Sequence, residues 1–129
     1  MFNFKPNLFN NEIGIDIGTV NTVLYLKSKG VVVNEPSVVA VRNIGRKGQK
    51  EIIAFGTDAK KMIGKTPIGI TTICPLSHGV IADFEMTEHM IRHYMHMAIG
   101  SGGMFSYPRV AVCVPACVTE VEKRAVVEV

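Results

Sequence analysis

A short stretch near the start of the chain combines a carboxylate, a glycine and small polar side chains in the order that a phosphate-binding turn requires. A strand that ends in the carboxylate, a tight turn and a second strand would form a β-hairpin around residues 18–20. Successive backbone N–H groups in such a turn can bind a phosphate, and the hydroxyl of Thr19 adds a donor. Glycine lets the backbone approach the ligand closely. The stretch is Asp16-Ile17-Gly18-Thr19-Val20-Asn21-Thr22.

Asp16 would lie opposite the bound phosphates, where only a divalent cation reconciles the like charges. Because Mg²⁺ usually keeps several waters, we expect Asp16 to hold the ion through water. A plain hairpin with a solvent-facing aspartate is the alternative, and the motif alone favours neither. The sequence contains neither GxxxxGK(S/T) nor GxGxxG, so the P-loop and Rossmann ways of binding phosphate are absent. The candidate cofactor-binding residues are therefore Asp16, Gly18, Thr19, Val20 and Asn21.

Alternation of apolar and polar residues predicts strands on both sides of this turn and further along the chain. A polar, glycine-containing loop at residues 42–50 is better explained as a solvated hairpin connection than as a nucleic-acid patch. The nearly continuous apolar run at 110–114 predicts a strand covered on both faces, with Cys113 as a small buried hydrophobe. The expected strands are residues 12–18, 21–27, 31–33, 37–41, 51–55, 70–73 and 110–114.

Three segments are predicted to be helical. Thr57 can cap a short helix at residues 58–63 that stops at Gly64. Residues 85–99 carry apolar side chains at helical spacing, and a capping box at residues 119–122 opens a last helix. The long helix is expected to bury Met86, Met90, Tyr94 and Met97 and to expose His89, Arg92, His93 and His96. The histidine spacing is compatible with metal binding, but no carboxylate or cysteine completes a site, so a solvated face is favoured.

Composition places the chain among globular proteins and excludes several classes. Its 129 residues are 47% hydrophobic and 19% charged, and the net charge of +3 is dispersed along the sequence, so nothing favours nucleic acid as a partner. Three cysteines without a CxxC pair indicate neither a disulfide framework nor a zinc site and fit a reducing cytoplasm. No apolar run approaches the length of about 18 residues that a transmembrane helix needs.

Several stretches together resemble a known family. Asp-x-Gly-Thr in a hairpin is similar to the first phosphate loop of the actin, sugar-kinase and heat-shock chaperone ATPase superfamily. Five further stretches resemble the MreB family of bacterial actins, in matching order and spacing from about residue 12 to the end. They are Lys29-Gly30 with Asn34-Glu35-Pro36-Ser37-Val38-Val39-Ala40, Gly64-Lys65-Thr66-Pro67, Gly79-Val80-Ile81-Ala82-Asp83-Phe84-Glu85, Pro108-Arg109-Val110, and Val114-Pro115 with Val118-Thr119-Glu120-Val121-Glu122-Lys123-Arg124-Ala125.

The resemblance implies an α/β fold of the actin-like ATPase (ribonuclease H-like) type, present in part. Residues 1–34 and 71–129 would belong to the large subdomain IA, and residues 35–70 to the inserted small subdomain IB. In the family, the water-positioning glutamate, the second phosphate loop and the adenosine pocket lie later in the sequence. We therefore expect a chain truncated at its C-terminus, without a catalytic residue of its own and without tight ATP binding.

The resemblance also implies a function for the intact protein. It would bind ATP and Mg²⁺, polymerise with itself into filaments beneath the cytoplasmic membrane, and determine cell shape. Its place would be the cytoplasm, peripheral to the inner face of the cell membrane, with cell-shape or wall-synthesis membrane proteins as further partners and no nucleic acid. A monomeric ATPase of the same fold, of the chaperone or sugar-kinase type, is one alternative, and a nonfunctional remnant is another.

The sequence departs from the family before its third conserved stretch. Where relatives usually have Arg-Pro-Leu-x-Asp-Gly-Val, this chain has Cys74-Pro75-Leu76-Ser77-His78-Gly79-Val80, so both the arginine and the aspartate are gone. The triplet that begins at His78 is similar to the His-Gly-Ile of eukaryotic actin, near the phosphate-release path. His78 is therefore a candidate for a phosphate-release loop, with an ordinary loop histidine as the alternative.

Met104 and Phe105 lie in a glycine-rich loop at residues 100–108, where exposed apolar side chains are costly. In MreB-like proteins this loop carries residues that insert into the membrane, so both are candidates for membrane contact. Packing on a neighbouring subunit or on the chain's own surface is the alternative. Pro6 argues against an amphipathic helix at the N-terminus. Four apolar residues there could nevertheless assist in membrane contact: Phe2, Phe4, Leu8 and Phe9.

Overall fold

The computed structural model describes residues 12–45, 48–65, 67–100, 108–113 and 119–129. Its strands are β1 Glu12–Ile17, β2 Asn21–Leu26, β3 Gly30–Pro36, β4 Val39–Ile44, β5 Gln49–Phe55, β6 Ile70–Ile73, β7 Leu76–Ser77, β8 Val80–Ile81 and β9 Arg109–Cys113. Its helices are α1 Gly56–Lys61, α2 Phe84–Ile99 and α3 Glu120–Glu128. The expected strands are thus found in order, although the ends of several differ, β3 being longer and β4 lying further along the chain. The short strands β7 and β8 were not predicted.

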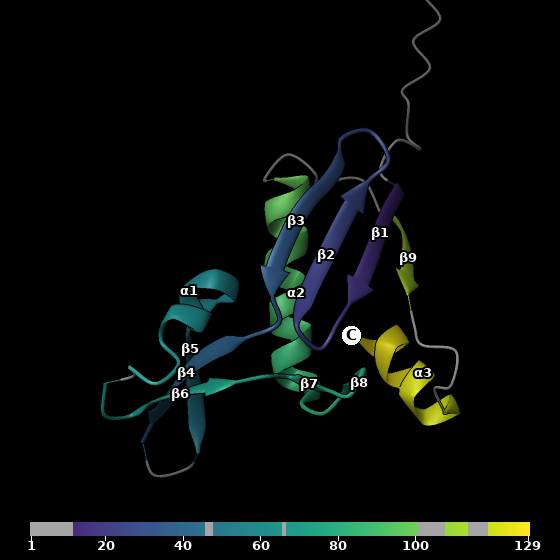
Figure 1. Ribbon diagram of the computed structural model, residues 1–129. Helices are drawn as coiled ribbons and strands as arrows, with labels where there is room; N and C mark the ends of the chain where they lie inside the picture. The colour runs from purple at the N-terminus through teal and green to yellow at the C-terminus, as the bar shows by residue number, and fades with distance from the viewer. Residues whose placement is uncertain (1–11, 46–47, 66, 101–107, 114–118) are drawn as a thin grey trace, which may run out of the picture.

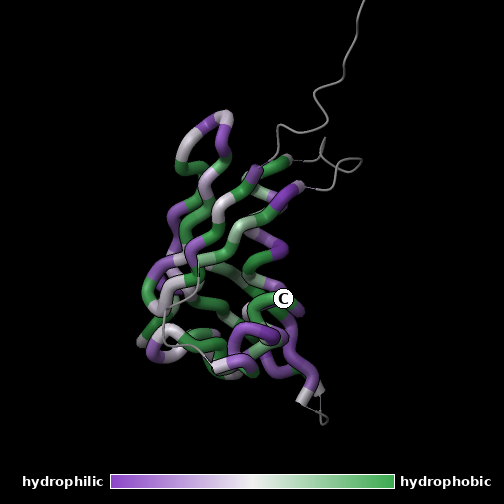
Figure 2. The backbone as a smooth tube through the Cα atoms, turned by 90° about the vertical axis from the view of Figure 1, so that its right-hand side faces the viewer, coloured by the Kyte–Doolittle hydropathy of each residue, from purple (hydrophilic) through white to green (hydrophobic). Residues whose placement is uncertain are grey.

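The first sheet has the strand order β3-β2-β1-β9. The strands β1, β2 and β3 form an antiparallel meander, and β9 adds in parallel to β1. Two neighbouring parallel strands must be joined by a crossover connection. Helix α2 forms part of the connection between β1 and β9 and crosses one face of the sheet (Figure 1). Side chains alternate between the two faces, so Ile13 and Ile15 point into the core and are nearly inaccessible to solvent, whereas Asp16 is exposed. Figure 2 shows the alternation of hydrophobic and hydrophilic residues along the strands.

Helix α2 packs against the inner face of this sheet. Its N-terminus is capped by Asp83, whose Oδ1 accepts a hydrogen bond from the Met86 N–H at 3.1 Å. The buried face is centred on Thr87, Tyr94 and Ala98, so the prediction is right for Met86, Met90 and Tyr94 but wrong for Met97. Met97, near the C-terminal end of the helix, is 55% exposed.

The second sheet has the order β5-β4-β6 and is built from two antiparallel pairs. The hairpin between β4 and β5 is longer than predicted, because Arg42, Asn43 and Ile44 all pair with residues of β5. The loop expected at residues 42–50 therefore shrinks to the connection between Ile44 and Gln49. Gly45 and Gly48 lie on either side of its tip with φ of 75° and 68°, a conformation that glycine adopts without steric cost.

Helix α1 begins two residues earlier than a cap at Thr57 would allow, so that prediction is wrong. The helix starts at Gly56, and the N-cap position is Phe55, which makes no side-chain hydrogen bond there. Thr57 instead donates from both its N–H and its hydroxyl to Oε2 of Glu35, each at 2.7 Å. A carboxylate from β3 thus accepts hydrogen bonds from the first turn of α1, where a negative charge is favourable.

Gly56 is the most constrained glycine of this junction. Its φ is 58°, and a Cβ added there would press on the Glu35 carboxylate and lie 2.8 Å from the Tyr94 hydroxyl. We expect Gly56→Ala to lower the free energy of unfolding by about 2–4 kcal/mol, from backbone strain and overpacking together. Gly30→Ala is the matched control, because Gly30 has φ of 79° and open space around it, so only the backbone cost of about 1–2 kcal/mol applies. Equal urea midpoints for the two variants would contradict this account.

Strand β9 and helix α3 complete the described chain. The capping box of α3 is confirmed: Glu122 N–H donates to Thr119 Oγ1 at 3.3 Å, and Thr119 N–H donates to Glu122 Oε2 at 2.6 Å. The prediction that β9 is covered on both faces is wrong, because most of its residues, Cys113 included, are exposed. On its inner side an apolar hollow of about 750 Å³ separates β1 and β9 from α2 and α3. Among the described residues β9 is an edge strand of its sheet, and its inner face borders this hollow.

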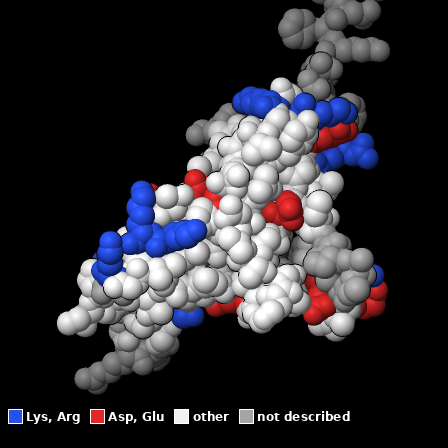
Figure 3. Space-filling model, viewed as in Figure 1, with Lys and Arg blue, Asp and Glu red and all other residues white. Residues whose placement is uncertain are grey.

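Positive charge is spread over the molecule. In the view of Figure 3, Lys and Arg side chains form separate groups, one over α1 and others toward the β2–β3 end of the first sheet. Acidic side chains lie between and beside them in that view. The net charge therefore does not gather into one continuous patch among the described residues of this face.

Candidate functional site

The β1–β2 hairpin has the shape that the sequence predicts. Its turn is closed by a hydrogen bond from the Gly18 N–H to the Asn21 carbonyl, at 3.0 Å. A Cβ on Gly18 would lie 2.5 Å from that carbonyl oxygen, so the chain's own close approach already requires glycine here. Thr19 and Val20 form the exposed tip, and the Val20 side chain is 71% exposed. The hairpin thus presents its tip to solvent, where a ligand could reach it.

Asp16 lies next to the end of β1, with Val23 and Cys113 as its partners on the two neighbouring strands. Its side chain is exposed on the face of the sheet opposite Ile15 and α2. Among the residues described, no three His, Cys, Asp or Glu side chains gather into a metal-binding group. Asp16 alone can supply one oxygen ligand, directly or through water, and a Mg²⁺ ion there would take its other ligands from water and phosphate. This donor chemistry fits the ion.

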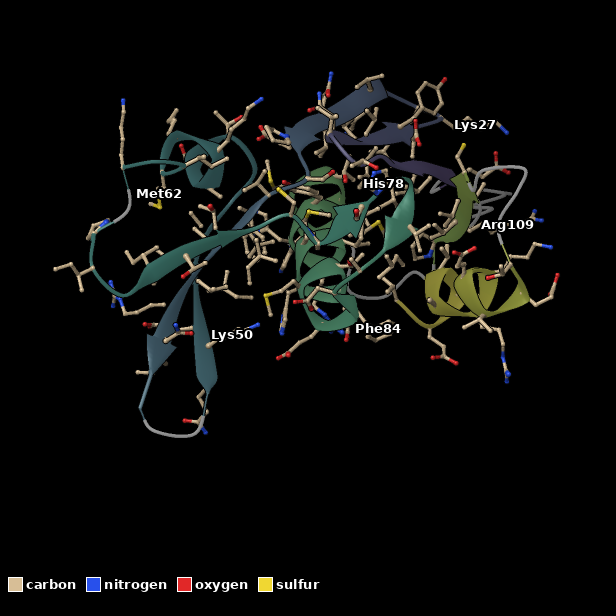
Figure 4. All side chains as sticks on the ribbon, turned by 60° about the horizontal axis from the view of Figure 1, so that its bottom comes forward. Lys27, Lys50, Met62, His78, Phe84 and Arg109 are labelled. Carbon is tan, nitrogen blue, oxygen red and sulfur yellow. The ribbon has the colours of Figure 1, made fainter. Side chains whose placement is uncertain are left out.

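The β7–β8 turn lies against the tip of the hairpin. The Gly79 N–H donates to Oγ1 of Thr19 at 2.7 Å, across 60 positions in the sequence. Because the hydroxyl accepts this bond, its own hydrogen remains free to donate to a ligand. His78 lies in the same turn (Figure 4). Its φ is 53°, and its Nδ1 lies 2.9 Å from Ser77 Oγ. The structure therefore brings the turn that contains His78 to the tip of the β1–β2 hairpin, and a role for His78 in phosphate release stays a prediction.

Beneath the hairpin lies a polar pair that sequence reasoning missed. Thr22 and Ser37 are both fully buried, and their hydroxyl oxygens are 2.9 Å apart. Ser37 Oγ donates to the Gly18 carbonyl at 2.6 Å, and the Ser37 N–H donates to the Val20 carbonyl at 2.9 Å. In the sequence this serine ends the Asn-Glu-Pro-Ser stretch. A serine directly after a proline gives no sign by itself of what it contacts.

The remaining candidates are placed as follows. The Asn21 side chain donates to Asn34 Oδ1 at 3.1 Å, so its amide also ties β2 to β3. The three histidines of α2 are exposed as predicted, and the ring of His93 stacks on Phe55 with centroids 4.4 Å apart. No helix among the described residues is long and apolar enough to cross a membrane. The candidates for membrane contact lie outside the described residues: Phe2, Phe4, Leu8, Phe9, Met104 and Phe105.

A comparison with protein families identifies the family to which this chain belongs. The model of the family described as MreB/Mbl protein matches residues 10–129. The chain belongs to the MreB/Mbl family. It is 47% identical over 121 residues to the cell shape-determining protein MreB of Escherichia coli K12, a match that covers 94% of this chain and 35% of that protein. It is 45% identical over 122 residues to the cell shape-determining protein Mbl of Bacillus subtilis 168, covering 94% and 35%.

Solved structures of family members have the same fold. MreB5 of Spiroplasma citri bound to ADP superposes with a TM-score of 0.76 at 35% identity, over 91% of this chain and 33% of that one. The same protein bound to AMPPNP gives a TM-score of 0.74 at 34% identity, over 91% and 34%. The predicted actin-like ATPase fold, present in part, is therefore confirmed, and the chain spans about a third of the length of these relatives. The subdomain boundaries at residues 34 and 70 stay a prediction.

Proposed function

We propose that this chain is the N-terminal part of an ATP-dependent, actin-like filament protein that polymerises under the cytoplasmic membrane and determines cell shape. The observation that carries the proposal is the exposed hairpin of Asp16, Gly18 and Thr19 within a fold shared with relatives solved with ADP and AMPPNP. The names of the curated relatives, cell shape-determining proteins, support the cellular role. The cytoplasmic location and the membrane or wall-synthesis partners belong to the same proposal.

Different residues of the hairpin would bind the phosphates and the Mg²⁺ ion. Backbone N–H groups of the turn and the free hydroxyl hydrogen of Thr19 would donate to phosphate oxygens. Asp16 would hold Mg²⁺ through water, and Mg–ATP, when bound, would supply the phosphoanhydride that is cleaved. The hydrogen bond from the Gly79 N–H holds the oxygen of the Thr19 hydroxyl in place. This hydroxyl would therefore already be positioned to donate when a phosphate binds.

A filament and a monomeric ATPase of the same fold differ in one observable. The Asn34-to-Ala40 and Gly79-to-Glu85 stretches resemble the filament-forming MreB family, which favours self-assembly. We expect the full-length protein that contains this chain to pellet in the ultracentrifuge with ATP and Mg²⁺ above a critical concentration, and to stay in solution below it. The control is the same protein without nucleotide. Turnover of ATP with no concentration-dependent pelleting would favour the monomeric ATPase instead.

A further inference from the structure

Ser37 lies directly beneath the β1–β2 hairpin and holds its turn by two hydrogen bonds. Its hydroxyl donates to the carbonyl of Gly18 at 2.6 Å, and its backbone N–H donates to the carbonyl of Val20 at 2.9 Å. The side chain is completely inaccessible to solvent, so water does not compete for either bond. A buried hydroxyl that serves a neighbouring turn, rather than its own strand, suggests a role in shaping that turn.

The direction of the hydrogen bonds follows from counting protons. A serine hydroxyl has one hydrogen, and in Ser37 it goes to the Gly18 carbonyl. The 2.9 Å contact between Ser37 Oγ and Thr22 Oγ1 must therefore have Thr22 as its donor. A chain of two hydrogen bonds thus runs from Thr22 through Ser37 to Gly18. Such chains polarise each other and lose strength when any one member is removed.

These bonds determine where the N–H groups of the turn point. A peptide group is planar and trans, so its C=O and its N–H point in opposite directions. The Gly18 carbonyl points toward the Ser37 hydroxyl, and the N–H of Thr19, in the same peptide group, points away from it. The Val20 carbonyl points toward the Ser37 N–H, and the N–H of Asn21 points away. Ser37 thereby directs the N–H groups of Thr19 and Asn21 away from itself.

The position of Ser37 is itself fixed by its neighbours. The carbonyl of Pro36 accepts a hydrogen bond from the Tyr94 hydroxyl of α2 at 2.9 Å. Burial, and next the negative charge of Glu35, raise the pKa of Tyr94 above its usual value, so the phenol remains a donor. Glu35 in turn is held by Thr57 of α1. Three consecutive residues, 35–37, therefore join α1, α2 and the hairpin.

We propose that Ser37 is a positioning residue for phosphate binding, which holds the Thr19 and Asn21 N–H groups in the orientation that a nucleotide phosphate needs. This inference rests on the proposed function, since it requires that the hairpin binds ATP. Removing the hydroxyl frees the Gly18 peptide to rotate, and its N–H partner in Thr19 then loses its fixed direction. Affinity for the phosphates is lost, whereas the groups that act in cleavage are untouched.

The test is Ser37→Ala in the full-length protein that contains this chain, with Ser28→Ala as the matched control, because Ser28 is exposed in the β2–β3 turn. We expect Ser37→Ala to raise the KM for Mg–ATP about tenfold and to leave kcat within about twofold, and Ser28→Ala to change neither. Thermal unfolding without nucleotide is measured in parallel. A folded Ser37→Ala protein that is less stable but keeps the wild-type KM would overturn the positioning role.

A second pair of variants serves if Ser37→Ala does not fold. Thr22→Val removes the donor to Ser37 while keeping the shape of the side chain, and Thr22→Ser keeps the hydroxyl. We expect a KM about threefold higher for Thr22→Val and a nearly normal KM for Thr22→Ser; equal KM values for the two would overturn the proposal. If the wild-type protein binds no ATP, the proposed function fails. If it binds ATP and Ser37→Ala binds equally well, only the role of Ser37 fails.

Discussion

Replacing Asp16 with alanine is expected to lower ATP turnover by about 10- to 100-fold in the full-length protein that contains this chain. The carboxylate is exposed beside the hairpin, and in the described part of the chain no cluster of metal ligands lies elsewhere to take its place. Without it, Mg²⁺ loses its protein anchor and the phosphates lose their orientation. The fold should remain intact, because exposed substitutions usually change stability by less than about 0.5 kcal/mol.

The measurement is steady-state phosphate release at saturating Mg–ATP, together with a thermal unfolding curve of each variant. Asp58→Ala is the matched control, since Asp58 is an exposed aspartate on α1 whose only polar contact among the described residues is its 2.9 Å ion pair with Lys61. Such a surface pair is worth little, so this variant should turn over ATP normally. If Asp16→Ala retained wild-type turnover, Asp16 would have no part in binding the ion.

The elements of this fold that follow from local sequence were predicted well. The hairpin of β1 and β2 and the capping box of α3 each depend on residues close together in the chain. The start of α1 was not predicted, because its first turn is satisfied by Glu35, 22 positions away from Thr57. The exposure of β9 was also missed, since an apolar run indicates what a strand can bury and not whether anything covers it.

The candidate site shows the same division between local and distant contacts. Its exposed members, from Asp16 to Asn21, form one continuous motif and could be predicted from it. The groups that hold the motif in place come from Ser37 and Gly79, which are 19 positions from Gly18 and 60 positions from Thr19. Neither lies at a spacing that indicates contact with the hairpin. Supporting residues of this kind become visible only when the strands are placed in space.

Replacing both Met104 and Phe105 with serine is expected to abolish membrane binding of the assembled full-length protein. These two residues lie outside the described part of the structure, so the prediction rests on the sequence and on the family resemblance. Burying two large apolar side chains in the acyl region contributes roughly 1.5–3 kcal/mol each. That is weak for one monomer, because ordering the loop at the interface offsets much of it. A filament presents many copies at once, so the same loop becomes effective through avidity.

Membrane binding and polymerisation should therefore be coupled. Assembled wild-type protein should float with liposomes in a density gradient, unassembled protein should hardly do so, and the double-serine variant should stay at the bottom while its ATP turnover is unchanged. The matched control replaces Ile63 and Ile68 with serine, because both are exposed apolar residues far along the chain from the loop. If the Met104 and Phe105 variant still floats, the apolar N-terminal residues become the better candidates: Phe2, Phe4, Leu8 and Phe9. If neither region matters, a protein partner must hold the filament at the membrane.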